Sequence, residues 1–172
     1  GKIVCNGTPE EIIKVKNNLV GVNTHRANKI VKHALENKLI SEFKNINNIK
    51  PEFKYSTDTR FDFLCDKNLI EVKNVTLNRE KDTAEFPDAI TSRGSKHLLN
   101  LKESMKKGYK PYVLFLTQIQ GIKNFKIARD IDEKYYENYH LAKKHGVNFI
   151  AYRCYLSNKE IKIEKKINII DE

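Results

Sequence analysis

Hydrophobic residues recur at helical spacing in three parts of the chain, which predicts three helices within residues 23–39, 85–108 and 132–146. In the first, five apolar residues form a stripe along one helix face: Ala27, Ile30, Val31, Ala34 and Leu35. The second begins as a loop and then becomes a helix. The residues expected to cap or end the helices are Asn23 or Thr24, Ser92 or Ser95, Gly108 and Gly146.

Strands are predicted where apolar residues alternate with polar ones, or run together, between turn residues. They cover residues 51–56, 60–65, 69–75, 110–118, 147–156 and 159–167. The fourth is nearly all apolar, as expected for a strand covered on both faces, and the last has the pattern of an edge strand. Because helices and strands mix within one chain, we expect an α/β fold with a mixed central sheet flanked by helices.

Three charged residues interrupt the second and third strands: Asp62, Glu71 and Lys73. Strand residues two apart share a face, so Glu71 and Lys73 point one way, and Phe61 and Phe63 point away from Asp62. A two-residue loop between the strands would place Asp62 opposite Glu71, and a four-residue loop would place it opposite Lys73. Both registers gather the charges on one face, whereas a three-residue loop would scatter them.

The chemistry of this cluster suits a divalent cation. Two neighbouring carboxylates repel each other, and a cation such as Mg²⁺ or Mn²⁺ relieves the repulsion. Asp62 and Glu71 would bind the ion, with the Val72 carbonyl as a third ligand, and Lys73 would orient a water or stabilise developing charge. The alternative is a surface salt bridge of Lys73 with Glu71 or Asp62, worth at most about 1 kcal/mol.

The net charge of +10, from 32 basic and 22 acidic residues, favours a polyanionic partner, most simply nucleic acid. A lysine-rich, well-solvated surface is the alternative. Three widely separated cysteines suggest neither a disulfide framework nor a C-x-x-C metal site, which fits reduced thiols and a cytoplasmic protein. The apolar runs are too short to span a bilayer, so no membrane association is expected, and no small-molecule cofactor is expected either.

An acid followed nine residues later by Glu-x-Lys on the next strand resembles the PD-(D/E)xK nuclease signature. Longer stretches, above all "FPDAITSRGSKHLLNL" at residues 86–101, resemble the sugar fermentation stimulation protein A (SfsA) family from about Leu19 to the C-terminus. The resemblance implies a restriction-endonuclease-like αβββαβ core. It also implies that Asp62 and Glu71 are metal ligands, that Lys73 is the catalytic lysine, and that the domain binds nucleic acid.

In this family a small OB-like domain precedes the nuclease-like domain. Residues 1–18 are too few to form it, so we expect them to be an N-terminal remnant or linker. Residues 19–172 are then the PD-(D/E)xK nuclease-like domain.

The start of the second helix is a candidate nucleic-acid contact. Arg93, Lys96 and His97 lie where backbone N–H groups favour a phosphate. The alternative is that Asp88 and Thr91 only shape the loop and cap the helix, and that His97 has a local structural partner.

Other acids are weaker candidates for the site. Glu36, near the edge of the apolar stripe of the first helix, and Asp88 are additional candidates. Asp58 is a rival to Asp62 but lies in a turn-rich segment. The tyrosines of the third helix are expected to pack rather than to stack on bases: Tyr135, Tyr136 and Tyr139.

Two classes of function follow from the sequence. One is a metal-dependent nuclease that hydrolyses phosphodiester bonds in nucleic acid, with DNA favoured over RNA. The other is a non-catalytic DNA-binding or regulatory module that retains the nuclease fold. Intact Asp62, Glu71 and Lys73 favour the enzyme, because a binding module has no need of adjacent carboxylates facing phosphate.

Overall fold

The computed structural model describes residues 12–15, 18–21, 26–157 and 160–171. Its helices are α1 (Arg26–Glu36), α2 (Ser92–Ser104) and α3 (Glu133–Lys144), with short 3₁₀ helices at Ser41–Phe43 and Met105–Lys107. The three predicted helices are thus confirmed, while the proposed caps Asn23 and Thr24 lie outside the described residues. None of the described helices is long and apolar enough to cross a membrane.

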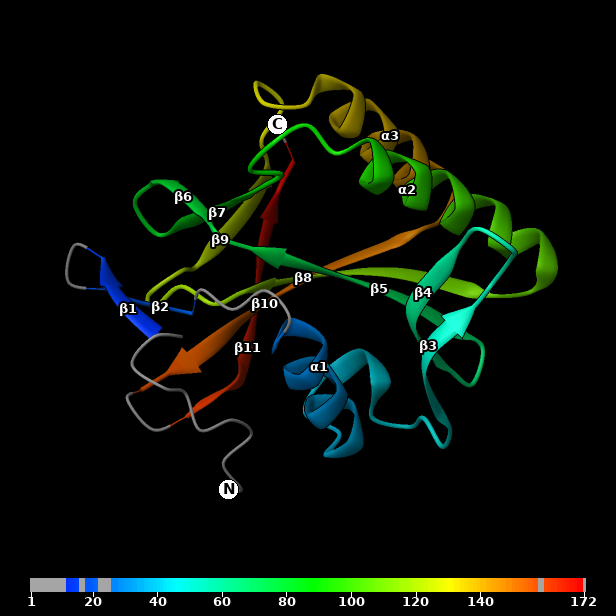
Figure 1. The fold of residues 1–172 in the computed structure, drawn as a ribbon, viewed down its shortest axis with the longest axis horizontal. Helices are drawn as coiled ribbons and strands as arrows, with labels where there is room; N and C mark the ends of the chain where they lie inside the picture. Colours follow the sequence, from blue (N-terminus) through cyan, green and yellow to red (C-terminus); the bar gives the residue numbers. More distant parts are fainter. Residues whose placement is uncertain (1–11, 16–17, 22–25, 158–159, 172) are drawn as a thin grey trace.

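Nine strands form one mixed sheet, in the order β3-β4-β5-β8-β10-β11-β9-β7-β6, and two more form a separate antiparallel hairpin (Figure 1). The hairpin strands are β1 (Ile12–Val15) and β2 (Asn18–Gly21). The sheet strands are β3 (Ile49–Lys54), β4 (Arg60–Cys65), β5 (Asn68–Val75), β6 (Leu77–Glu80), β7 (Thr83–Phe86), β8 (Lys110–Thr117), β9 (Asn124–Ile127), β10 (Asn148–Leu156) and β11 (Ile161–Ile170). The sheet is mixed: β3, β4 and β5 are antiparallel neighbours, whereas β5, β8 and β10 are parallel.

The central sheet separates two hydrophobic cores. Helix α1 covers one face with the five residues of its predicted stripe, all of them buried. Helices α2 and α3 cover the opposite face (Figure 1). Along β8, Leu114 and Leu116 pack on the α1 side, while Val113 and Phe115 pack on the other side, as the alternation of a strand requires. Tyr135 and Tyr139 of α3 are buried in this second core, so their predicted packing role is confirmed.

Strand β4 changes face at Asp62, contrary to the regular alternation expected from the sequence. Phe63 packs on the α1 side, but Phe61 packs in the core under α2 and α3. The ladder between β4 and β5 ends at the pair Phe63–Ile70. Beyond it the Asp62 carboxylate, rather than a backbone carbonyl, accepts the hydrogen bond of the Val72 N–H at 2.7 Å. The Asp62 carboxylate therefore takes the place of a backbone carbonyl as the acceptor for Val72, and the Phe61 side chain lies on the opposite face of the sheet from Phe63.

The prediction that residues 159–167 form an edge strand is wrong. Strand β11 lies inside the sheet, antiparallel to β10 and parallel to β9. Its pairing with β9 uses only Asn168–Ile170, beyond the predicted strand. Because the predicted segment itself pairs only with β10 among the described residues, its polar pattern resembles that of an edge strand.

Cys65 and Cys154 are buried free thiols, while Cys5 lies outside the described residues. Burial raises the pKa of the Cys65 thiol to about 12. A thiol that stays protonated and buried is unreactive, which agrees with the expected structural role of these two cysteines.

The N-cap of α2 is Thr91, not the predicted Ser92 or Ser95. The Thr91 hydroxyl accepts from the Gly94 N–H at 3.0 Å, and the Thr91 N–H donates to Asp132 at 2.8 Å. Asp132 is itself the N-cap of α3. One short chain of hydrogen bonds thus joins the N-terminal ends of both helices and holds the loop that leads to α2.

Thr91→Ala is expected to lower the free energy of unfolding by about 1 to 2 kcal/mol, because it removes this cap. The matched control is Ser92→Ala, in which the neighbouring exposed hydroxyl is lost without a cap. Chemical denaturation of both variants measures the difference. Equal stabilities for the two variants would show that Thr91 does not cap α2.

Candidate functional site

Asp62 and Glu71 lie on the adjacent antiparallel strands β4 and β5, joined by a two-residue turn in which Cys65 pairs with Asn68. This register, with a two-residue loop, is the first of the two that were expected from the sequence to bring Asp62, Glu71 and Lys73 together. Two donors hold the Asp62 carboxylate. The Val72 N–H bonds to Oδ2, and Asn28 Nδ2 of α1 bonds to Oδ1 at 2.6 Å.

Glu71 is buried, with an exposed fraction of 5%. Its Oε1 accepts from Lys73 Nζ at 2.7 Å and lies 2.5 Å from His97 Nδ1 of α2. The described residues give Glu71 Oε2 no hydrogen bond. Lys73 and His97 therefore both contact one oxygen of Glu71, and the other oxygen is free for a further ligand. Glu71 is enclosed between β5 and α2, so its ion pair with Lys73 is not a surface salt bridge.

The two carboxyl groups differ in their electrostatics. Burial, and then the negative charge of Glu71, raise the pKa of Asp62 to about 6, against the opposing hydrogen bonds from Val72 and Asn28. Burial also acts to raise the pKa of Glu71, but the hydrogen bond from His97 and the charge of Lys73 outweigh it, so that the pKa of Glu71 lies below its ordinary value. Asp62 thus carries an unfavourable charge at neutral pH, which a cation would stabilise.

A hollow of about 540 Å³, here called the carboxylate hollow, contains both acids. Its lining residues are Ala27, Asn28, Lys29, Glu52, Arg60, Phe61, Asp62, Glu71, Val72, Lys73, Asn74, Arg93 and His97. In the part of the chain that the structure describes, no group of three or more His, Cys, Asp or Glu side chains could hold a metal. An ion here would have two carboxylates at most, and would need backbone, water or substrate oxygens as well, as Mg²⁺ commonly does.

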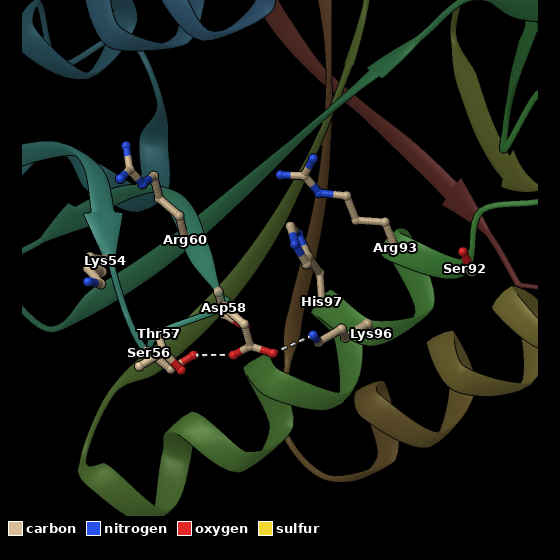
Figure 2. A pocket seen from close by; sticks show the side chains of 10 residues that line it. Lys54, Ser56, Thr57, Asp58, Arg60, Ser92, Arg93, Lys96 and His97 are labelled. Carbon is tan, nitrogen blue, oxygen red and sulfur yellow. Dashed lines mark hydrogen bonds and ion pairs between the residues drawn. The ribbon is translucent and has the colours of Figure 1, made fainter.

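A second hollow of about 590 Å³, here called the basic hollow, adjoins the first. Its lining residues are Lys54, Ser56, Thr57, Asp58, Thr59, Arg60, Ser92, Arg93, Lys96 and His97 (Figure 2). Arg60, Arg93 and His97 line both hollows. The α2 residues predicted to contact nucleic acid are therefore brought next to the acids of β4 and β5.

The predicted phosphate contacts differ in their surroundings. Lys96 Nζ lies 2.5 Å from Asp58 Oδ2, and Ser56 donates to the other oxygen of the same carboxylate (Figure 2). The Lys96 hydrogen bond, with that from Ser56, lowers the pKa of Asp58 to about 2. Arg93 is exposed and has no hydrogen bond or ion pair to the described residues. His97 contacts Glu71 through Nδ1, so its local structural partner is a predicted metal ligand.

Glu36 and Asp88 are not brought into either hollow. Glu36 lies about two helical turns beyond Asn28 on α1 and pairs with Lys32 at 3.8 Å. Asp88 accepts from the Thr76 hydroxyl at 3.1 Å and so shapes the loop before α2. Asp58, the rival first acid, faces Lys96 across the basic hollow rather than Glu71.

Sequence reasoning missed two residues of the site, Asn28 and Arg60. Asn28 directly follows Ala27, the first residue of the apolar stripe of α1, and nothing in its spacing indicates that it donates to Asp62. Arg60 precedes Asp62 by two positions on β4, and its guanidinium pairs with Glu52 at 3.7 Å, with both groups more than half exposed. Its place two residues before Asp62 on the same strand could have been recognised from the sequence as a position close to the site.

A family model described as "Sugar fermentation stimulation protein RE domain" matches residues 25–160. The chain belongs to the SfsA family. The sugar fermentation stimulation protein homolog of Pelagibacter ubique (strain HTCC1062) is 64% identical over 165 residues, which cover 94% of this chain and 71% of that protein. The homolog of Clostridium perfringens (strain 13 / Type A) is 40% identical over 157 residues, covering 88% and 67% respectively.

Among solved structures, that of Pyrococcus furiosus SfsA in complex with Ca²⁺ matches with a TM-score of 0.84. The match covers 94% of this chain and 71% of that one, at 23% sequence identity. The α/β fold with its mixed sheet is therefore the SfsA fold.

Proposed function

We propose that this SfsA-family chain is a metal-dependent nuclease with a restriction-endonuclease-like core, which binds nucleic acid and hydrolyses phosphodiester bonds in DNA or RNA. One observation carries the proposal. Asp62 and Glu71 meet on adjacent strands in one hollow, with Lys73 bonded to Glu71 and with Arg60 and Arg93 at the rim. Carboxylates flanked by cations suit a site that holds both a metal ion and a phosphate.

The donor set fits Mg²⁺ or Mn²⁺. Asp62 carries a charge that burial and Glu71 disfavour, Glu71 Oε2 has no hydrogen bond to the described residues, and the Val72 carbonyl would be a third oxygen. The related Pyrococcus furiosus protein binds Ca²⁺, another cation that takes oxygen ligands. When bound, such an ion acidifies water and polarises a phosphoryl oxygen.

The residues of the chain hold this centre in place. Asn28 and the Val72 N–H fix the Asp62 carboxylate, and His97 fixes Glu71 from the opposite side of the hollow. The Lys73 ammonium, with an exposed fraction of 15%, faces the same space and is placed to orient water or to stabilise charge on the phosphate. Positions fixed by hydrogen bonds before substrate binds need no rearrangement during the reaction.

Cleavage assays test the proposal directly. Labelled single- and double-stranded DNA and RNA are incubated with the protein in Mg²⁺, in Mn²⁺ or in EDTA. Cleavage of at least one substrate is expected with a metal and not with EDTA. Failure to cleave any of them with either metal would overturn the proposal.

A non-catalytic nucleic-acid-binding module is the second candidate. Lys73 donates to Glu71 and His97 contacts the same oxygen, as in a purely structural hydrogen-bonded cluster. In that case the protein binds the same substrates without cleaving them.

Arg93→Gln is expected to lower the slope of log K against log salt by about one unit for nucleic-acid binding, because Arg93 is free to neutralise a phosphate. Lys96→Gln should have a smaller effect, since Lys96 is paired with Asp58. Binding titrations in EDTA at several salt concentrations measure both slopes. An unchanged slope for both variants would remove the start of α2 from the contact surface.

A further inference from the structure

The basic hollow carries more positive charge than one internal phosphodiester requires. Four cationic side chains and one carboxylate line it, a net of about three positive charges: Lys54, Arg60, Arg93 and Lys96 against Asp58. In the carboxylate hollow, four cations face three carboxylates: Lys29, Arg60, Lys73 and Arg93 against Glu52, Asp62 and Glu71. An internal phosphodiester has one negative charge, whereas a terminal phosphate has between about 1.5 and 2 at neutral pH.

The basic hollow lies between the turn that joins β3 to β4 and the N-terminal part of α2 (Figure 2). Arg60, Arg93 and His97, which also line the carboxylate hollow, mark the side that adjoins the carboxylates. Two contacts fasten this turn to α2: the ion pair of Lys96 with Asp58, and a hydrogen bond of 2.8 Å from Asn100 Nδ2 to the hydroxyl of buried Thr59. A strand that extends from the carboxylates into the basic hollow therefore meets the fastened turn.

We propose that the basic hollow binds the terminal phosphate of a nucleic-acid strand whose nearby phosphodiester lies at Asp62 and Glu71. The second part of this proposal, that a nearby phosphodiester lies at Asp62 and Glu71, rests on the proposed function. Arg93, which has no partner among the described residues, and Arg60, whose pairing with Glu52 is long and exposed, are the main ligands. Arginine suits this role because its guanidinium can donate two parallel hydrogen bonds to one phosphate.

The proposal specifies the substrate class. The preferred substrate is a linear strand with a phosphorylated end, and cleavage occurs within a few nucleotides of that end. A circular strand offers only singly charged internal phosphates, which gain less from the positive charge of the hollow.

Binding in EDTA tests the inference without depending on cleavage. Three versions of one short single-stranded oligonucleotide are compared: one with a 5′-phosphate, one with a 3′-phosphate and one with hydroxyl groups at both ends. The wild-type protein should bind one phosphorylated end about tenfold more tightly than its hydroxyl counterpart. The end that gains affinity identifies the polarity of the bound strand.

Arg60→Gln with Arg93→Gln should abolish this preference. Lys144→Gln is the matched control, because this exposed lysine at the end of α3 lines neither hollow, and it should keep the preference. Equal binding of all three oligonucleotides by the wild type, or a preference that persists in the double variant, would overturn the terminal-phosphate site. If the preference is present but no substrate is cleaved with metal, the site stands and the nuclease proposal fails.

Discussion

Asp62→Asn and Glu71→Gln should each abolish metal-dependent cleavage, with a fall in rate of at least about 10³-fold. Each substitution keeps the shape of the side chain but removes the charge on which a hard divalent cation depends. Nucleic-acid binding in EDTA should stay the same or become tighter, because a negative charge leaves the hollow. Initial rates in Mn²⁺ and binding titrations in EDTA measure the two effects separately.

The control for this pair is Glu36→Gln, which removes an exposed carboxylate of α1 that lines neither hollow. It should cleave like the wild type. Asp62→Asn should not be less stable than the wild type without metal, because the raised pKa of Asp62 means that its ionised form disfavours the folded state. The stability of the wild type relative to Asp62→Asn should accordingly rise as the pH falls from about 6 towards 4. A variant of Asp62 that cleaves normally would contradict its assigned role.

Lys73→Met should retain metal binding but lose turnover by a factor of about 10² or more. The substitution keeps the length of the side chain and removes one fixed positive charge from the position where negative charge develops. Because Lys73 also neutralises Glu71, its loss should leave the Mn²⁺ affinity unchanged or raise it. Single-turnover rates at saturating Mn²⁺ separate this effect from a loss of metal.

Lys67→Met is the matched control for Lys73→Met. Lys67 lies in the exposed turn of the same hairpin and lines neither hollow. It should leave the single-turnover rate unchanged. If Lys73→Met cleaves as fast as this control, the ion pair of Lys73 with Glu71 is only structural.

The apolar stripe of α1 could be predicted because one face of this helix meets the core. The succession of β3, β4 and β5 could be predicted because short segments rich in apolar residues are bounded by turn residues. Strands β6, β7 and β9 were missed. Glu85 in β7 is almost fully buried, and it is tolerated there because Arg79 of β6 donates two hydrogen bonds to its carboxylate. A buried charge whose partner lies on the neighbouring strand leaves no periodic signal.

The site was predictable to the extent that it depends on one hairpin. The shared face of Glu71 and Lys73 follows from the strand pattern, whereas the pattern left the length of the loop between β4 and β5 open, and the structure has the two-residue alternative. The change of face at Asp62 does not, because it depends on a side chain that replaces a backbone acceptor. The contacts from α1 and α2 also depend on tertiary packing, which places Asn28 on Asp62 and His97 on Glu71.

Calorimetric titration of Mn²⁺ into the wild type and into Asp62→Asn tests most directly whether the two carboxylates form a metal site. The wild type should bind one ion per chain at this site, and Asp62→Asn should lose that binding while it keeps its fold and its affinity for nucleic acid in EDTA. Mn²⁺ binding that is equally tight in the two proteins, or absent from the wild type, would contradict the assignment of Asp62 and Glu71 as metal ligands.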